Sequence, residues 1–266
     1  MVVPGALAIS IDWQLLFERI FTPGSTFWKA LGTTITIAII SELAGIVLGF
    51  LTWLATRSRL RLVRALAFTY MLAFRGTPLV VQVFFIYFGT NLFLGIDIFP
   101  REVAILGLGI PGAVLAGVVG LSLNEGAYMS EIIRAGIDAI DIGQMESALS
   151  VGMRRRVAMR RIVLPQAARV IIPPLGNQFN YMIKSTSLLA FIGVYEMFRD
   201  AQIVYSRNFQ PVEVFLSVAF WYLVLTTLWS LVQVQLERRF GASEVAEDEP
   251  WTQRILGIQA ASGSSR

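Results

Sequence analysis

The chain has 266 residues, of which 55% are hydrophobic and only 15% are charged, and its mean hydropathy is +0.65. Roughly a quarter of the residues of a soluble domain are charged, so the composition excludes water as the only solvent of this chain. The formal net charge is +4, but the arginines gather in short clusters between apolar runs, which is typical of cytoplasmic membrane edges and disfavours nucleic acid as a partner. The chain has no cysteine and no histidine, so it lacks the usual residues of metal centres and of much nucleophilic catalysis.

An N-terminal segment, residues 1–28, precedes the first long apolar run. Within it, residues 9–21 place Ile9, Trp13, Leu16, Phe17 and Ile20 at helical spacing. The pattern predicts a short amphipathic helix, which either lies along the membrane surface or packs against the first span.

Five apolar runs follow, each long enough for a helix that crosses a bilayer, which takes about 20 residues. They cover 31–55, 65–89, 103–133, 164–197 and 212–236. Arg75-Gly76-Thr77-Pro78 interrupts the second run, Pro111-Gly112 the third and Pro173-Pro174 the fourth, so kinks or breaks are expected there. The sequence therefore predicts an all-α membrane domain over residues 29–240 and a polar C-terminal tail over residues 241–266.

The arginines also predict the orientation, because lysine and arginine accumulate in cytoplasmic loops close to span ends. The basic segments are 56–64, 134–161 and the one that holds Arg238 and Arg239, whereas 90–102 and 198–211 are nearly balanced. Five spans that alternate between these loops place the N-terminus outside and the C-terminus in the cytoplasm.

The loop between the third and fourth spans carries a spaced motif. Glu146-Ser147-Ala148 is followed after three residues by Gly152, and after nine more by Ile162, one residue and Leu164-Pro165. This spacing resembles the EAA loop of the permease subunits of ABC importers, with a serine in place of the first alanine. The resemblance implies that residues 143–157 form a short coupling helix that docks into a cleft on the ATPase subunit.

The residue types suit such a helix. Gly143 and Gly152 can punctuate it, and Ala148 permits close approach. The carboxylate of Glu146 is expected in the first turn, where the helix dipole favours a negative charge. The alternative reading of the segment is an ordinary amphipathic loop helix.

Three further segments narrow the resemblance to permeases for polar amino acids, over about residues 30–240. They are RGTPLVVQ at 75–82 with FIYFG at 85–89, GAY at 126–128 with Glu131-Ile132 and Arg134, and the stretch that joins LPQA at 164–167, PPLGNQ at 173–178 and IKSTSL at 183–188. Such permeases of the cytoplasmic (inner) membrane work as multi-pass homodimers or heterodimers with two copies of an ATPase. An extracytoplasmic binding protein delivers the amino acid to the outer loops, near 90–102 and 198–211 here.

The resemblance also implies that the chain is a transporter subunit rather than an enzyme. No metal and no cofactor are expected in this chain, because ATP and Mg²⁺ would be held by the ATPase. The lipid bilayer and the transported amino acid are then its remaining partners.

Five ionisable side chains are candidates to lie near the bilayer centre: Glu42, Arg75, Glu125, Glu131 and Lys184. An uncompensated charge near the bilayer centre costs about 3 kcal/mol or more, so such groups face a bundle interior or a polar cavity. Glu42 and Glu131 are interpreted as members of buried structural ion pairs, Glu131 with Arg75. Lys184 follows the expected break at Pro173-Pro174, and interrupted helices next to polar groups form midplane substrate sites. Lys184 is therefore the first candidate to bind a substrate carboxylate.

The resemblance implies that the segment from Gln178 to Ser187 contributes the substrate pocket. Some relatives for basic amino acids carry a glutamate at the position of Gln178, and an aspartate is common at that of Ser185. Because both residues are neutral here, a neutral or acidic substrate such as glutamine or glutamate is favoured. A free carboxylate at Glu125 would instead suit lysine or arginine. The candidate substrate site comprises Lys184, Gln178, Ser185, Glu125 and Arg75.

Three other functions compete with this reading. An ion-coupled secondary transporter would use Glu42, Glu125 and Glu131 as proton or sodium sites, but five spans are few for that role and the motif in the cytoplasmic loop would be unexplained. A channel needs no docking helix for an ATPase. A membrane enzyme would need a catalytic motif, and the sequence has neither a Gly-x-Ser-x-Gly elbow nor a phosphate-binding loop with its lysine.

Overall fold

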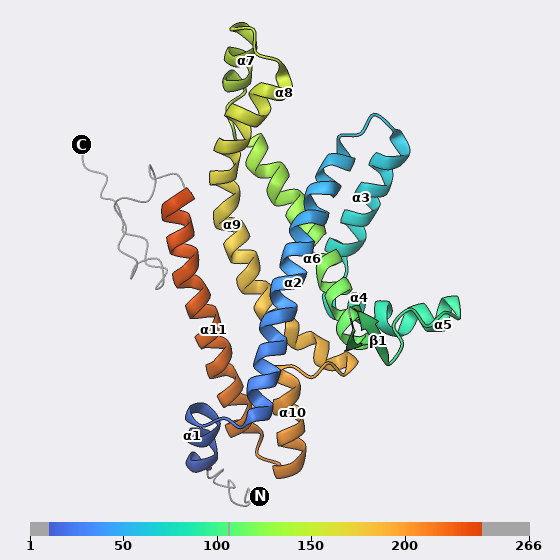
Figure 1. Cartoon of the computed structure of the whole chain (residues 1–266), viewed down its shortest axis with the longest axis vertical. Coiled ribbons are helices and arrows are strands. Elements are labelled where there is room, and N and C mark those ends of the chain that lie inside the picture. The colour runs from blue at the N-terminus through green and yellow to red at the C-terminus, as the bar shows by residue number, and fades with distance from the viewer. Residues whose placement is uncertain (1–10, 106, 241–266) are drawn as a thin grey trace, which may run out of the picture.

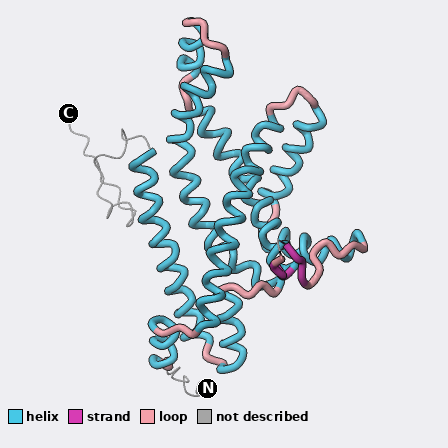
Figure 2. Tube along the Cα trace, viewed as in Figure 1, coloured by secondary structure: helices cyan, strands magenta, loops and turns pink. Residues whose placement is uncertain are grey.

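The computed structural model describes residues 11–105 and 107–240, and these residues form a helical bundle with one small hairpin (Figures 1 and 2). Before the hairpin lie α1 (Trp13–Phe21), α2 (Ser25–Thr56), α3 (Arg61–Gly76), α4 (Leu79–Phe84), the π-helical η1 (Phe85–Gly89) and α5 (Thr90–Leu94). The hairpin pairs β1 (Glu102–Ile105) with β2 (Leu108–Pro111). After it come α6 (Gly112–Asp138), α7 (Ile142–Ser150), α8 (Arg155–Ala158), the π-helical η2 (Met159–Val163), α9 (Leu164–Ser185), the 3₁₀-helical η3 (Thr186–Ile192), α10 (Met197–Asn208) and α11 (Pro211–Phe240). Ile9 and the predicted polar tail lie outside the described residues.

Each of the five apolar runs contains a long helix or a helix pair. By length and composition alone, α2 and α11 are able to cross a membrane, and α3 with the helix that follows it makes a third candidate if the two count as one broken span. These two helices meet at 112°, and the break lies at Thr77-Pro78, where the sequence predicts it. The remaining long helices, α6 and α9, are not among these candidates and pack between the others.

Helix α6 occupies the centre of the bundle, where its most extensive partner is α2. Two glycines of α2 allow the close approach. A Cβ atom on Gly45 would lie 2.5 Å from Cγ of Glu125, and one on Gly49 would lie 2.4 Å from Cβ of Met129. Small residues at such a crossing let two membrane helices pack backbone to backbone.

The outward faces of the longest helices are apolar. Leu43 on α2 is 60% exposed, and Leu223 and Leu231 on α11 are 63% and 62% exposed. Large apolar patches of this kind on a soluble monomer mark contact with a membrane or a partner. The arrangement agrees with the hydropathy of the sequence, because the apolar residues that the bundle does not bury lie where lipid would be.

The third apolar run differs from the prediction. Residues 102–105 and 108–111 form the antiparallel hairpin, and Gly107 between them adopts a left-handed backbone (φ +81°). Pro111 caps the start of α6 instead of kinking a helix. The prediction that the helix begins near 103 is therefore wrong, because a glycine-rich turn followed by a proline favours a hairpin and then a helix start.

The expected break at Pro173-Pro174 is also absent, since α9 runs through both prolines. Helix α11 supports this part of α9 with two side chains. Gln233 Nε2 donates to the carbonyl of Pro173 at 3.4 Å, and Trp229 Nε1 donates to the carbonyl of Gly176 at 2.8 Å. These two bonds tie α11 to α9 beside the prolines.

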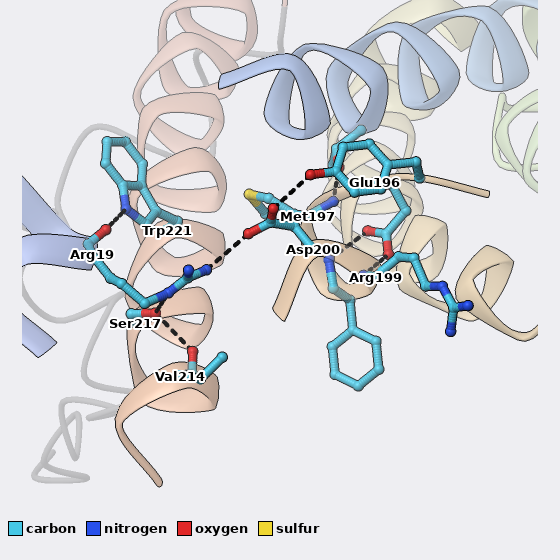
Figure 3. Close-up of polar contacts among 11 residues, drawn as sticks. Arg19, Glu196, Met197, Arg199, Asp200, Val214, Ser217 and Trp221 are labelled. Atoms are coloured by element: carbon cyan, nitrogen blue, oxygen red, sulfur yellow. Dashed lines mark hydrogen bonds and ion pairs between the residues drawn. The ribbon is translucent and has the colours of Figure 1, made fainter. Parts of the chain in front are cut away.

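Helix α1 packs on α11 and reaches α10 through a buried polar network (Figure 3). Arg19 Nη2 lies 2.9 Å from Asp200 Oδ2, and Arg19 Nε donates to Ser217 Oγ at 3.2 Å. Trp221 Nε1 donates to the carbonyl of Arg19 at 3.3 Å. The helix is thus held by the last span and α10, rather than by the first span.

The opposite face of α1 is an aromatic stripe of Trp13, Phe17 and Phe21, spaced four residues apart and exposed. The predicted amphipathic pattern is present from Trp13 onward, with Leu16 on the buried side.

Candidate functional site

The predicted coupling segment is a helical hairpin at one end of the bundle, far from α1 and α10 (Figure 1). Asp141 caps α7 through its side chain, which accepts from the N–H of Gly143 at 2.6 Å. At the other end, Gly152 adopts φ +86°, and the next N–H, of Met153, donates to the carbonyl of Ala148 at 3.1 Å. This left-handed residue ends the helix as glycine commonly does. Glu146 lies in the second turn, so the expectation of a carboxylate in the first turn is wrong; Asp141 takes that place.

The hairpin turns one face inward and another outward. Ala148 is buried, and Met145 packs on the apolar cluster around Trp53, whereas Glu146 and Ser147 are exposed. The outward face also carries two apolar side chains that the sequence reasoning did not single out, Ile142 at 74% and Val151 at 77% exposed. Their positions at the two edges of the motif could have indicated that they belong to the same surface. Together they make a small mixed surface at the tip of the chain that suits docking to another protein.

The second candidate region lies in the middle of the bundle, where Glu125 of α6 meets Gln178 of α9. Gln178 Nε2 donates to Glu125 Oε2 at 3.3 Å, and Glu125 is only 1% exposed. Glu42 of α2 is also buried, and it lies three residues before Gly45, against which the side chain of Glu125 packs. Of the five predicted substrate residues, the structure brings together Glu125 and Gln178.

Arg75, at the end of α3, lies elsewhere. Its Nη1 atom is 3.7 Å from Oε2 of Glu131, its guanidinium lies over the ring of Tyr128, and Glu131 also bonds Arg134. The Arg75–Glu131 pair is the one expected from the sequence, but the two side chains are 40% and 31% exposed, so it is not a buried pair. No ion pair of the described residues includes Glu42, so its assignment to a structural ion pair is wrong. The residue opposite it on α6 is another acid.

Lys184 and Ser185 also do not join Glu125. Lys184 lines a cavity of about 390 Å³ with Phe198, Phe215 and Tyr222, between the end of α9 and helices α10 and α11. Ser185 is buried and donates to the carbonyl of Tyr181. Lys184 lies six positions after Gln178, which is about 600° of helical turn, so the two point to different sides of α9. The helical periodicity of the sequence could have predicted this separation, but the expected break at Pro173-Pro174 suggested that the helix would not continue.

A further polar pair holds the broken span together. Gln82 Nε2 donates to the carbonyls of Phe74 and Thr77, while its Oε1 atom accepts from Asn124 Nδ2 at 2.9 Å. Asn124 also donates to the carbonyl of Phe74. These bonds satisfy backbone groups that the break at Pro78 would leave unpaired.

The comparisons with known proteins fit these two regions. The family model described as "Binding-protein-dependent transport system inner membrane component" matches residues 43–242. The chain belongs to this family. The arginine transport system permease protein ArgU of Corynebacterium glutamicum is 40% identical to the permease over 209 residues, which are 78% of this chain and 66% of ArgU.

Two more relatives extend the likeness. The glutamine transport system permease protein GlnP of Escherichia coli is 36% identical over 232 residues, which are 87% of the permease and 98% of GlnP. A solved structure, described as the crystal structure of an amino acid ABC transporter with histidines, is 34% identical with a TM-score of 0.74 and covers 87% of the permease and 100% of the solved chain. The permease therefore has the fold of the type I ABC importer permeases, and it is a transporter subunit of the amino-acid class rather than an enzyme.

Proposed function

We propose that this permease carries a polar amino acid across the cytoplasmic (inner) membrane by alternating access, driven by two copies of a separate ATPase. The observation that carries the proposal is the capped helix α7 at the tip of the chain, with Glu146 and Ser147 turned outward. A rigid, protruding helix of this kind can receive a movement from a docked subunit and transmit it to the spans. ATP and Mg²⁺ are assigned to the ATPase, and the permease is proposed to bind no cofactor.

The arrangement of the basic segments supports the proposed orientation. The α2–α3 connection, the α7–α8 hairpin and the C-terminal end of α11 lie toward one end of the bundle, whereas α1 and α10 lie at the other (Figure 1). With the basic end in the cytoplasm, the N-terminus is outside and the ATPase meets α7. An extracytoplasmic binding protein then meets the outer segments, 90–102 and 198–211. A second permease, identical or similar, completes the membrane part as a homodimer or heterodimer.

The substrate class at this level is a polar amino acid. The relatives are named for arginine and for glutamine, so their names point to more than one side chain. Within this chain, the neutral residues Gln178 and Ser185 favour glutamine or glutamate, and the buried carboxylate of Glu125 favours a cationic side chain.

A charge reversal on α7 tests the coupling assignment. Glu146→Lys is expected to leave membrane insertion intact but to abolish co-purification of the ATPase in mild detergent and ATP-dependent amino-acid uptake. Glu18→Lys is the matched control, because Glu18 is an exposed glutamate on α1 at the other end of the molecule. Uptake that survived Glu146→Lys at the level of the control would show that α7 is not the coupling helix.

A further inference from the structure

Two buried carboxylates, those of Glu42 and Glu125, lie at the α2–α6 crossing in the centre of the bundle. Glu42 is 4% and Glu125 is 1% exposed. The side chain of Glu125 lies over Gly45, which is three residues after Glu42 and therefore on the same face of α2. The close approach of the two backbones at this glycine is what brings the acids together.

The pair lacks partners that would compensate its charge. Three of its four carboxylate oxygens, both of Glu42 and Oε1 of Glu125, have no hydrogen-bond partner among the described residues. The hydroxyl of the adjacent Ser41 is also buried and has none. The fourth oxygen accepts only the neutral amide of Gln178.

The two cationic residues of the candidate substrate site lie elsewhere. Arg75 lies beside Glu131, and Lys184 lines the cavity next to α10 and α11. Two adjacent carboxylates in an interior of low dielectric constant repel each other, and each is costly to keep charged without a positive partner. A positive group that entered between them would gain from both.

We infer that Glu42 and Glu125 together bind the positively charged side chain of the transported amino acid, so that the substrate class is cationic, of the arginine and lysine type. The inference rests on the proposed function, because it concerns the substrate of the same translocation site. It assigns to Glu42 a role in specificity in place of a structural ion pair.

The oxygens without hydrogen-bond partners favour a cationic side chain over the side chains of glutamine and glutamate. A guanidinium carries five N–H donors in a planar fork, and the pair with Ser41 offers four unpartnered oxygens. A lysine ammonium brings the same charge with three donors. The side-chain amide of glutamine brings no charge, and the carboxylate of glutamate adds a third negative group to the pair. Gln178 is half-buried, so the pair borders the surface of the single chain through α9.

The test measures binding of amino acids to the permease–ATPase complex in detergent, without the binding protein, so that the specificity of that protein does not enter. Radiolabelled L-arginine is the probe, and unlabelled L-lysine, L-glutamine and L-glutamate compete with it. On the wild-type complex, L-lysine is expected to displace the probe at a concentration at least tenfold lower than L-glutamine or L-glutamate. This arm needs no variant and is therefore independent of folding defects.

The isosteric variants Glu42→Gln and Glu125→Gln are expected to weaken L-arginine binding at least tenfold each, and Glu18→Gln on the exposed face of α1 is the matched control. Equal or better displacement by L-glutamine or L-glutamate would overturn the inference, as would L-arginine binding within twofold of wild type in both variants. Absence of binding of any of the four amino acids to the wild-type complex would also overturn it. The proposed function is judged separately, by co-purification of the ATPase and ATP-dependent uptake in the same preparation.

Discussion

Replacing Arg19 by methionine should loosen the end of the bundle that holds α1 and α10. The side chains of Arg19 and Asp200 are only 14% and 5% exposed, and their atoms approach to 2.9 Å. Breaking a buried pair by removing one partner costs about 3–5 kcal/mol, because the other charge stays buried without compensation. Asp200 keeps the hydrogen bond from the Tyr195 hydroxyl at 2.7 Å, so we expect the lower end, about 3 kcal/mol. Methionine preserves most of the apolar stem of the arginine.

The measurement is the unfolding free energy of the purified permease in mixed micelles with increasing denaturing detergent. A double-mutant cycle with Asp200→Asn isolates the pair, because the double variant carries neither charge of the pair. The Arg19→Met and Asp200→Asn changes are expected to be coupled by at least about 1.5 kcal/mol. A coupling energy below about 0.5 kcal/mol would refute the reasoning, since the network would then not hold α1 to α10.

Two other substitutions test close packing and backbone conformation. Gly49→Ala should lower the unfolding free energy by about 1–3 kcal/mol, because its Cβ atom would lie 2.4 Å from that of Met129. Gly32→Ala in the same helix is the control, since its Cβ atom would meet open space and the change should be neutral or stabilising. Equal effects of the two changes in the same unfolding assay would contradict the tight α2–α6 crossing. Gly152→Ala should cost about 1–2 kcal/mol of stability at the left-handed end of α7 and reduce co-purification of the ATPase several-fold. Gly152→Asn should retain most of the co-purification, because asparagine tolerates the left-handed conformation. Full co-purification with both variants would show that this turn does not shape the docking surface.

Local patterns predicted much of the fold. Hydropathy located the long helices, Thr77-Pro78 marked the break in the second span, and Gly152 marked the end of α7. These features depend on residues within a few positions of one another, because backbone geometry and missing N–H groups act locally. The pairing of Arg75 with Glu131 was also predictable, because an uncompensated charge within a membrane is costly and such groups commonly pair with one another.

The remaining errors involve contacts between distant segments. The chain cannot reveal from its own periodicity that Trp229 and Gln233 of α11 support α9 beside its two prolines. Nor does it reveal that the residue opposite Glu42 is Glu125, because that depends on the register of α2 against α6. The structure was therefore needed to tell which of the candidate substrate residues lie together.

The continuity of α9 has a mechanical consequence. The helix begins directly after the α7–α8 hairpin and η2, and it runs for 22 residues, or about 33 Å, past Gln178 to Ser185. A kinked span would absorb a displacement of its end by bending at the kink. An unbroken one acts as a lever arm, so a tilt imposed on the hairpin would move Gln178 relative to Glu125 of α6, to which it is hydrogen-bonded.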